Sequence, residues 1–380
     1  MAALPLFPQR MNAATDDGYA STMSVRSLVS SATRIGAEIT GPNDRSFTVV
    51  TEANYTLNSS PTPWLSATLP AAMKANMSLT LAGDVDEAAL DNSNRAQDVL
   101  SMWYPRHYPR VVVEAQTTPA SADRASGVGC FFSGGVDSFY SAFTRSEQIT
   151  HLIFVHGFDI AIDDAELAAE ALQAARAAAA EIGKPLIEVR TTLRSAFGDP
   201  LELTWGHIYH GAALAHVANA LSPHLGTVIV PSSFRTDQLH PWGSHPDLDS
   251  AWSSSTMTIE HDNVDVGRFQ KIRAISDSSI AMKHLRVCWQ NRDGRFNCGR
   301  CSKCLRTKLG IEIAGAQCMT LPGSLDPKAI RRMYVDQTER MFLREALTEL
   351  REGDLNAPEL ERAVRSAIRR SYVLQYFARG

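Results

Sequence analysis

The sequence lacks a long apolar segment. No run among its 380 residues approaches the roughly 20 consecutive apolar residues that a bilayer-spanning helix needs. Residues 1–30 also lack the charged start and the continuous apolar centre of a signal peptide. We therefore expect a cytoplasmic protein that makes no membrane contact.

Cysteine is scarce and the net charge is small. Six cysteines are too few for a disulfide scaffold in a chain of this length. A net charge of −4 gives no general attraction to nucleic acid, so we do not expect a nucleic-acid partner. With 44% hydrophobic and 21% charged residues, the composition is typical of a soluble globular protein with two or three folding units.

One glycine-rich segment, S-G-G-V-D-S at residues 133–138, follows an apolar, aromatic-rich run and precedes helix-compatible residues. This order predicts a strand, a tight loop and a helix. Glycines let backbone N–H groups converge on phosphate oxygens at the positive end of the helix. Ser133 and Ser138 add hydroxyl donors, and Asp137 is placed to hold magnesium. The segment predicts a phosphate site, and an ordinary Gly-Gly turn is the alternative.

Strand-like and helix-like segments alternate after this loop. We expect buried strands at 151–157, 186–190 and 227–231, an alanine-rich helix capped by Asp163-Asp164, and a further helix over about 209–221. This spacing is typical of βαβ units. The predicted fold class is therefore α/β, with a parallel, doubly wound sheet that helices cover on both faces.

Ligands of such sheets bind at the carboxyl ends of the strands. Besides the S-G-G loop, residues 156–159, 191–194 and 232–237 should meet there. These segments contain three charged residues, Asp159, Arg194 and Asp237. Each of them either faces the crevice or is a solvated cap, and the sequence does not decide between these alternatives. The long irregular segment 231–275 is expected to form a lid or a substrate wall.

A basic segment follows that wall. Arg268 and Lys271 are three residues apart, so they share one face of the helix expected there. A plain solvated basic face is the alternative.

Four of the six cysteines lie close together, at Cys288, Cys298, Cys301 and Cys304. Thiolates with this spacing can surround a tetrahedral zinc ion. An iron–sulfur cluster is the rival, but the proline that follows the last cysteine in ferredoxins is missing, which favours zinc. We expect the other two, Cys130 and Cys318, to be core thiols.

The flanks carry less chemical information. Residues 1–20 are expected to be a poorly ordered start, and residues 21–120 a small, mainly β or α+β accessory domain that could dock a partner protein or a second copy. Its aromatic and basic segment 103–110 either packs a domain boundary, which we favour, or stacks on a ring. Residues 326–380 are expected to form a helical extension.

The S-G-G-V-D-S loop, followed about 150 residues later by the cysteine cluster, resembles the PP-loop ATP pyrophosphatases, and within them the 7-cyano-7-deazaguanine synthases. The resemblance covers roughly residues 126–316. It implies an adenine nucleotide alpha hydrolase-like fold that uses ATP, Mg²⁺ and Zn²⁺. By this comparison Asp137 and Lys271 are catalytic, and Lys271 neutralises the departing pyrophosphate. The candidate cofactor-binding residues are Ser133, Gly134, Gly135, Asp137, Ser138, Val155, His156, Arg235 and Arg268.

The activity that this resemblance implies is ATP-dependent adenylylation of a carboxylate, with release of AMP and pyrophosphate and formation of an amide or nitrile from a nitrogen nucleophile. The acid is a deazaguanine-like or other small molecule, or a peptide or protein carboxylate. Segment 156–159 lacks the family's aromatic-Gly-Gln run, so the substrate is open. Two alternatives are a nucleotide-binding partner subunit with reduced catalysis and a tRNA sulfur transferase, for which Cys130 is poorly placed.

Overall fold

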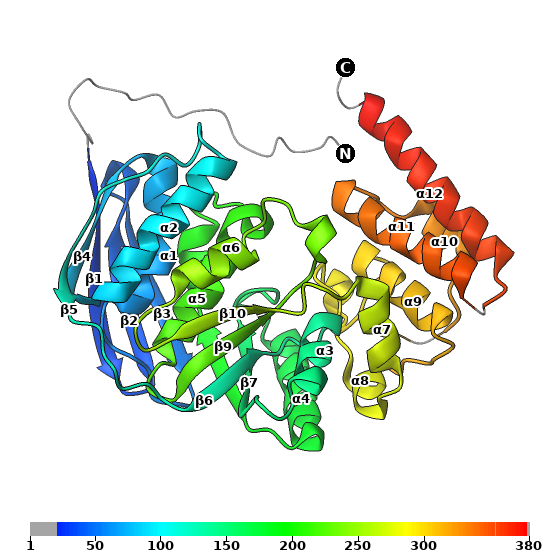
Figure 1. The fold of residues 1–380 in the computed structure, drawn as a ribbon, viewed down its shortest axis with the longest axis horizontal. Coiled ribbons are helices and arrows are strands. Elements are labelled where there is room, and N and C mark those ends of the chain that lie inside the picture. The colour runs from blue at the N-terminus through cyan, green and yellow to red at the C-terminus, as the bar shows by residue number, and fades with distance from the viewer. Residues whose placement is uncertain (1–20, 322, 354, 378–380) are drawn as a thin grey trace.

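The computed structural model describes residues 21–321, 323–353 and 355–377, and it shows an α/β fold built on one ten-stranded sheet (Figure 1). The order across the sheet is β10-β9-β6-β7-β8-β3-β2-β1-β4-β5. The strands are β1 (Thr22–Ser31), β2 (Arg34–Thr40), β3 (Ser46–Ala53), β4 (Ser78–Asp86), β5 (Val113–Thr118), β6 (Gly127–Phe131), β7 (His151–His156), β8 (Leu186–Thr191), β9 (Leu225–Pro231) and β10 (Thr258–Asp262). The predicted disordered start, residues 1–20, lies outside the described residues.

Strands β10, β9, β6, β7 and β8 are parallel to one another. Successive side chains of a strand point to opposite faces, so Cys130 of β6 packs into one core while the next residue, Phe131, packs into the other. Helices α1, α2, α5 and α6 pack on the Phe131 face, and α3, α4, α7 and α8 on the Cys130 face. Burial on both faces explains why these strands are continuous apolar runs in the sequence.

The sheet as a whole is mixed, which corrects the expectation of a wholly parallel sheet. Strand β3 pairs antiparallel with β8, where Thr51 lies opposite Thr191. Strands β2 and β1 continue antiparallel, and β4 and β5 then run parallel to β1. The N-terminal strands therefore extend the parallel part of the sheet beyond β8 (Figure 1).

The helices are α1 (Thr62–Ala75), α2 (Glu87–Trp103), α3 (Val136–Thr144), α4 (Ala165–Ile182), α5 (His210–Ala220), α6 (Pro246–Asp249), α7 (Arg268–Ser276), α8 (Ser279–His284), α9 (Ser302–Ile313), α10 (Pro327–Arg332), α11 (Gln337–Glu352) and α12 (Pro358–Phe377). Helix α4 begins and ends as its sequence predicts. The side chain of Asp164 accepts from the N–H of Leu167, and Gly183 ends the helix at φ 78°.

Helix α1 and strand β10 are among the elements that the sequence patterns did not predict. Helix α1 is buried along nearly its whole length, so it has no polar face to give an amphipathic period. Strand β10 lies within the segment 231–275 that we expected to be irregular. It reads T-I-E-H-D, in which Ile259 is the one apolar side chain, and this short edge strand therefore lacks an apolar run.

The C-terminal end is mostly helical, as expected. Helices α10, α11 and α12 pack around a third core that also takes Phe234 and Phe269, and Figure 1 shows them in orange and red at one end of the molecule. None of the helices in the described residues is both long and apolar enough to cross a membrane.

Candidate functional site

The S-G-G-V-D-S loop connects β6 to α3, as predicted. Gly134 has φ 73°, a conformation that side chains other than glycine rarely adopt. Gly135 is the N-cap of α3 and supplies no side-chain cap, while the hydroxyl of Ser138 donates to the Gly135 carbonyl over 3.0 Å. The loop therefore presents the backbone N–H groups of a helix start at the carboxyl end of the parallel strands.

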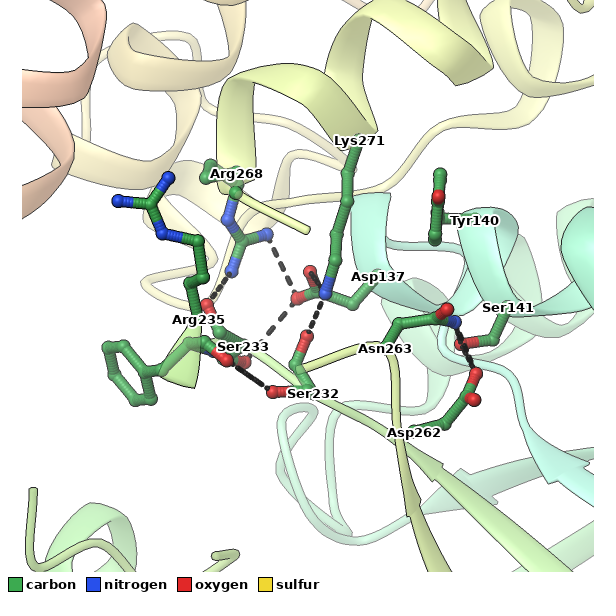
Figure 2. A network of polar contacts seen from close by, with 12 residues as sticks. Asp137, Tyr140, Ser141, Ser232, Ser233, Arg235, Asp262, Asn263, Arg268 and Lys271 are labelled. Atoms are coloured by element: carbon green, nitrogen blue, oxygen red, sulfur yellow. Dashed lines mark hydrogen bonds and ion pairs between the residues drawn. The ribbon is translucent and has the colours of Figure 1, made fainter. Parts of the chain in front are cut away.

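Two cations of α7 converge on the carboxylate of this loop (Figure 2). Arg268 Nη1 lies 2.9 Å from Asp137 Oδ2, and Lys271 Nζ lies 3.7 Å from Oδ1. Lys271 also donates to the Ser232 carbonyl over 2.7 Å, and the Ser233 hydroxyl donates to Asp137 over 3.4 Å. Residues at the end of β9 thus complete the network, and the three-residue spacing of the cations places both on the face of α7 that meets α3.

This cluster contains two positive charges and one negative charge, and its cations are buried from solvent. The side chain of Lys271 is 2% exposed and that of Arg268 is 9% exposed. Burial lowers the pKa of Lys271 and of Arg268 below their ordinary values, and Asp137 opposes the shift in both. Because a buried charge is costly unless it is paired, and because the two cations share one ion-paired carboxylate, the cluster is suited to receive an anion. A phosphate chain at the neighbouring helix start is a matching ligand.

Other predicted residues lie farther from this cluster. Val155 and His156 end β7, and the His156 ring contacts the Ala161 carbonyl over 3.1 Å. Arg235 pairs with Asp237 through two contacts of 2.6 Å, and its guanidinium points away from Asp137 in Figure 2. The Asp237 side chain is 61% exposed, which fits the solvated-cap alternative.

The remaining strand-end residues are held by local contacts. Arg194 donates to the Phe158 carbonyl over 2.6 Å and lies over the Trp205 ring at 4.5 Å. The backbone carbonyl of Asp159 accepts from Asn291 over 2.8 Å. These local contacts do not bring Arg194 into the Asp137 network.

A second buried polar group adjoins the first and was not foreseen. Asp262, at the end of β10, accepts from the Ser141 hydroxyl over 2.8 Å and from Arg145 Nη1 over 2.6 Å. Figure 2 shows this group beside Lys271, on the α3 side of the site. The sequence analysis missed Asp262 because it missed β10, whose carboxyl end carries it.

The four clustered cysteines meet the geometric requirements of a metal site. Their four Sγ atoms all lie within 4.8 Å of one another, and all four residues are buried. The Cys288–Cys301 and Cys298–Cys304 Sγ separations are 3.9 Å and 4.0 Å. Tetrahedral zinc with bonds of about 2.3 Å places its sulfurs about 3.8 Å apart. The donor set and spacing therefore fit a zinc ion.

Backbone donors stabilise the thiolate form of these ligands. The N–H of Cys301 donates to Cys298 Sγ over 3.3 Å, and the N–H of Cys304 donates to Cys301 Sγ over 3.4 Å. The side chain of Cys304 also hydrogen-bonds to Cys301, which lowers the pKa of Cys301 to about 5 and raises the pKa of Cys304. A metal ligand must be deprotonated, so the two backbone donors favour metal binding.

The other two cysteines are buried, as expected of core thiols. Cys130 is 0% exposed, and burial raises the pKa of its thiol well above the ordinary value. Cys318 is 7% exposed. A protonated thiol inside a central strand is a poor nucleophile, so the structure offers no support for sulfur transfer through Cys130.

Comparisons of the chain with protein-family models, with curated proteins and with solved structures found no match.

Proposed function

We propose that this chain is an ATP pyrophosphatase of the PP-loop type, which adenylylates a carboxylic acid and resembles the 7-cyano-7-deazaguanine synthases. The observation that carries the proposal is the convergence of Arg268 and Lys271 on Asp137 at the start of α3. A helix start, a glycine-rich loop and two buried cations together fit a polyphosphate.

In this reaction an oxygen of the acid attacks the α-phosphorus of ATP. The bond from that phosphorus to the bridging oxygen of the β-phosphate breaks, and pyrophosphate leaves with the electron pair. Arg268 and Lys271 lie where they stabilise the charge that develops on pyrophosphate, and the low exposure of both strengthens this effect. A nitrogen nucleophile then attacks the acyl carbon and expels AMP, which leaves an amide.

Magnesium would supply further neutralisation of the phosphate charge. Asp137 is the residue that would hold it, because its carboxylate belongs to the loop itself and Oδ1 has no hydrogen-bond partner among the described residues. Arg268 and Lys271 balance this carboxylate before nucleotide binds. Both side chains would then also contact the phosphates of a bound nucleotide.

The test is product analysis with labelled ATP, in the presence of ammonium and a panel of carboxylic acids that includes deazapurine acids and carboxylate-bearing peptides. We expect AMP and pyrophosphate, formed only when an acceptable acid is present. ADP and phosphate as the products would refute the proposal. Tight ATP binding without AMP formation from any acid would instead favour the nucleotide-binding partner subunit.

A further inference from the structure

The C-terminal helices contact the first turn of α7, which carries both cations of the proposed site. Glu345 Oε1 of α11 accepts a hydrogen bond from the Phe269 N–H over 2.8 Å, although the two residues are 76 positions apart. The first N–H groups of a helix have no partner within the helix. A carboxylate there satisfies one of them and is favoured by the positive end of the helix.

Gly267 makes room for this carboxylate. It is the N-cap of α7, so it offers no side-chain acceptor of its own. A Cβ atom at Gly267 would lie 2.4 Å from Glu345 Oε1, which is closer than real contacts allow. The glycine at the start of α7 and the glutamate of α11 therefore fit together, and a residue outside the α/β core supplies the cap.

Phe342 precedes Glu345 by one turn of α11 and faces the same way. The Arg268 guanidinium lies 5.2 Å from the centre of the Phe342 ring, and the Arg306 guanidinium of α9 lies 4.1 Å from it. The same ring stacks on Phe234 at 5.7 Å, with 10° between the planes. Phe342 thus contacts Arg268 and also touches the loop after β9.

Two ion pairs fix α11 in this place. Arg273, which lies later in α7, pairs with Glu349 of α11. Arg306 of α9 pairs with Glu339 of α11 over 2.8 Å, and both side chains are buried. Helix α11 is therefore bound to α7 and α9 at several points along its length. The position of Glu345 and Phe342 relative to α7 is set by more than one contact.

We infer that Glu345 and Phe342 of α11 are positioning residues that hold Arg268 and Lys271 in register with Asp137 for an incoming polyphosphate. The identity of that anion rests on the proposed function, whereas the helix cap does not. Phosphate oxygens need cations at fixed places. Within the nine-residue helix α7, Gln270 accepts from the Gly267 N–H over 3.1 Å, and Glu345 of α11 supplies the acceptor for the Phe269 N–H. The C-terminal helices would then be part of the nucleotide site.

The experiment compares Glu345→Ala with Glu345→Gln in the full chain, since the glutamine carboxamide oxygen can still accept from the Phe269 N–H. Glu352→Ala is the matched control, because Glu352 is exposed on the same helix. In nucleotide-free protein, we expect Glu345→Ala to speed amide hydrogen exchange at Phe269 by about five-fold or more, the factor typical of a lost cap. Glu345→Gln and Glu352→Ala should remain near wild type.

The second measurement is calorimetric binding of ATP and of inorganic pyrophosphate. We expect Glu345→Ala to raise both dissociation constants by about five-fold or more, and Glu345→Gln to restore most of the affinity. Unchanged exchange at Phe269 in Glu345→Ala would overturn the inference. Faster exchange with unchanged affinity would also overturn it, because Glu345 would then only pack.

Phe342→Leu provides a second route if Glu345→Ala does not fold. It keeps an apolar side chain but removes the ring beneath Arg268, so we expect weaker pyrophosphate binding with a retained fold. Affinity equal to wild type in this variant would contradict the role of Phe342. Failure of the proposed function would show in the products formed by wild-type protein, and the exchange rate at Phe269 would still decide the inference about the cap.

Discussion

The backbone N–H of Arg286 donates a hydrogen bond to the carbonyl oxygen of Gly134 over 2.8 Å. Two residues later Cys288 begins the cysteine group, and the N–H groups of Val287 and Cys288 both donate to Asn297 Oδ1. One short segment therefore connects the candidate metal centre to the S-G-G-V-D-S loop. A metal ion that fixes Cys288 would also fix the partner of the Gly134 carbonyl.

Metal removal should therefore affect both stability and nucleotide affinity. We expect the purified protein to be colourless and to hold one zinc ion per chain. Chelation, or Cys301→Ser, should lower the melting temperature by about 5 °C or more and weaken ATP binding. Elemental analysis, a visible spectrum and calorimetry measure these effects. A brown protein that contains iron would contradict the zinc assignment and favour an iron–sulfur cluster.

The Asp137 carboxylate should be needed for both turnover and stability. In Asp137→Asn, Arg268 and Lys271 lose their buried counter-charge, so the ligand-free protein should melt at a lower temperature. AMP formation should fall by about 100-fold or more. Asp237→Asn is the control, because that carboxylate is 61% exposed and pairs locally. Equal activity in the two variants would refute the role of Asp137.

Gly157, at the turn after β7, should not tolerate alanine. Its φ is 109°, and an added Cβ atom would lie 1.9 Å from the Thr191 carbonyl oxygen. Gly183 has φ 78° but no atom within 4 Å of the added Cβ, so Gly183→Ala should cost only about 1 kcal/mol of unfolding free energy. Gly157→Ala should cost several times more, as measured by denaturant unfolding. Similar losses in both variants would contradict the backbone clash.

His216 should make stability depend on pH. Its ring is buried between the Thr51 hydroxyl and the Pro63 carbonyl, each 2.9 Å away, and burial lowers its pKa from 6.5 to about 4. As the pH falls, His216 therefore binds a proton in the unfolded chain before it does so in the folded chain. The stabilising contribution is present above pH 6.5 and is lost progressively as the pH falls toward 4, by about 3 kcal/mol in total.

The measurement is urea unfolding of wild type and His216→Gln between pH 4 and pH 7.5. The difference in unfolding free energy between the two proteins should shrink as the pH falls through this window, since the variant has no proton to bind there. A difference that stays constant with pH would contradict a neutral, buried His216.

Local patterns were enough to predict the loop, the cysteine group and the shared face of Arg268 and Lys271. Each of these depends on residues that are close in sequence. Strand β10 was not predicted because four of its five residues are polar, which is typical of a loop. Helix α1 was not predicted because it is buried on all sides, so its sequence has no amphipathic period. The contact of Glu345 with Phe269 joins residues 76 positions apart, and no local pattern encodes it.

The antiparallel ladder between β3 and β8 has a consequence for any shortened form of the chain. Three residue pairs form this ladder, Thr51↔Thr191, Glu52↔Arg190 and Ala53↔Val189, and they cover the outer backbone of β8 from Val189 to Thr191. A fragment without β3 would leave those N–H and C=O groups as a bare sheet edge, which is a template for pairing with another chain. We therefore expect such a fragment to aggregate. We expect the full chain to unfold as one cooperative unit, because β8 joins the two parts of the sheet.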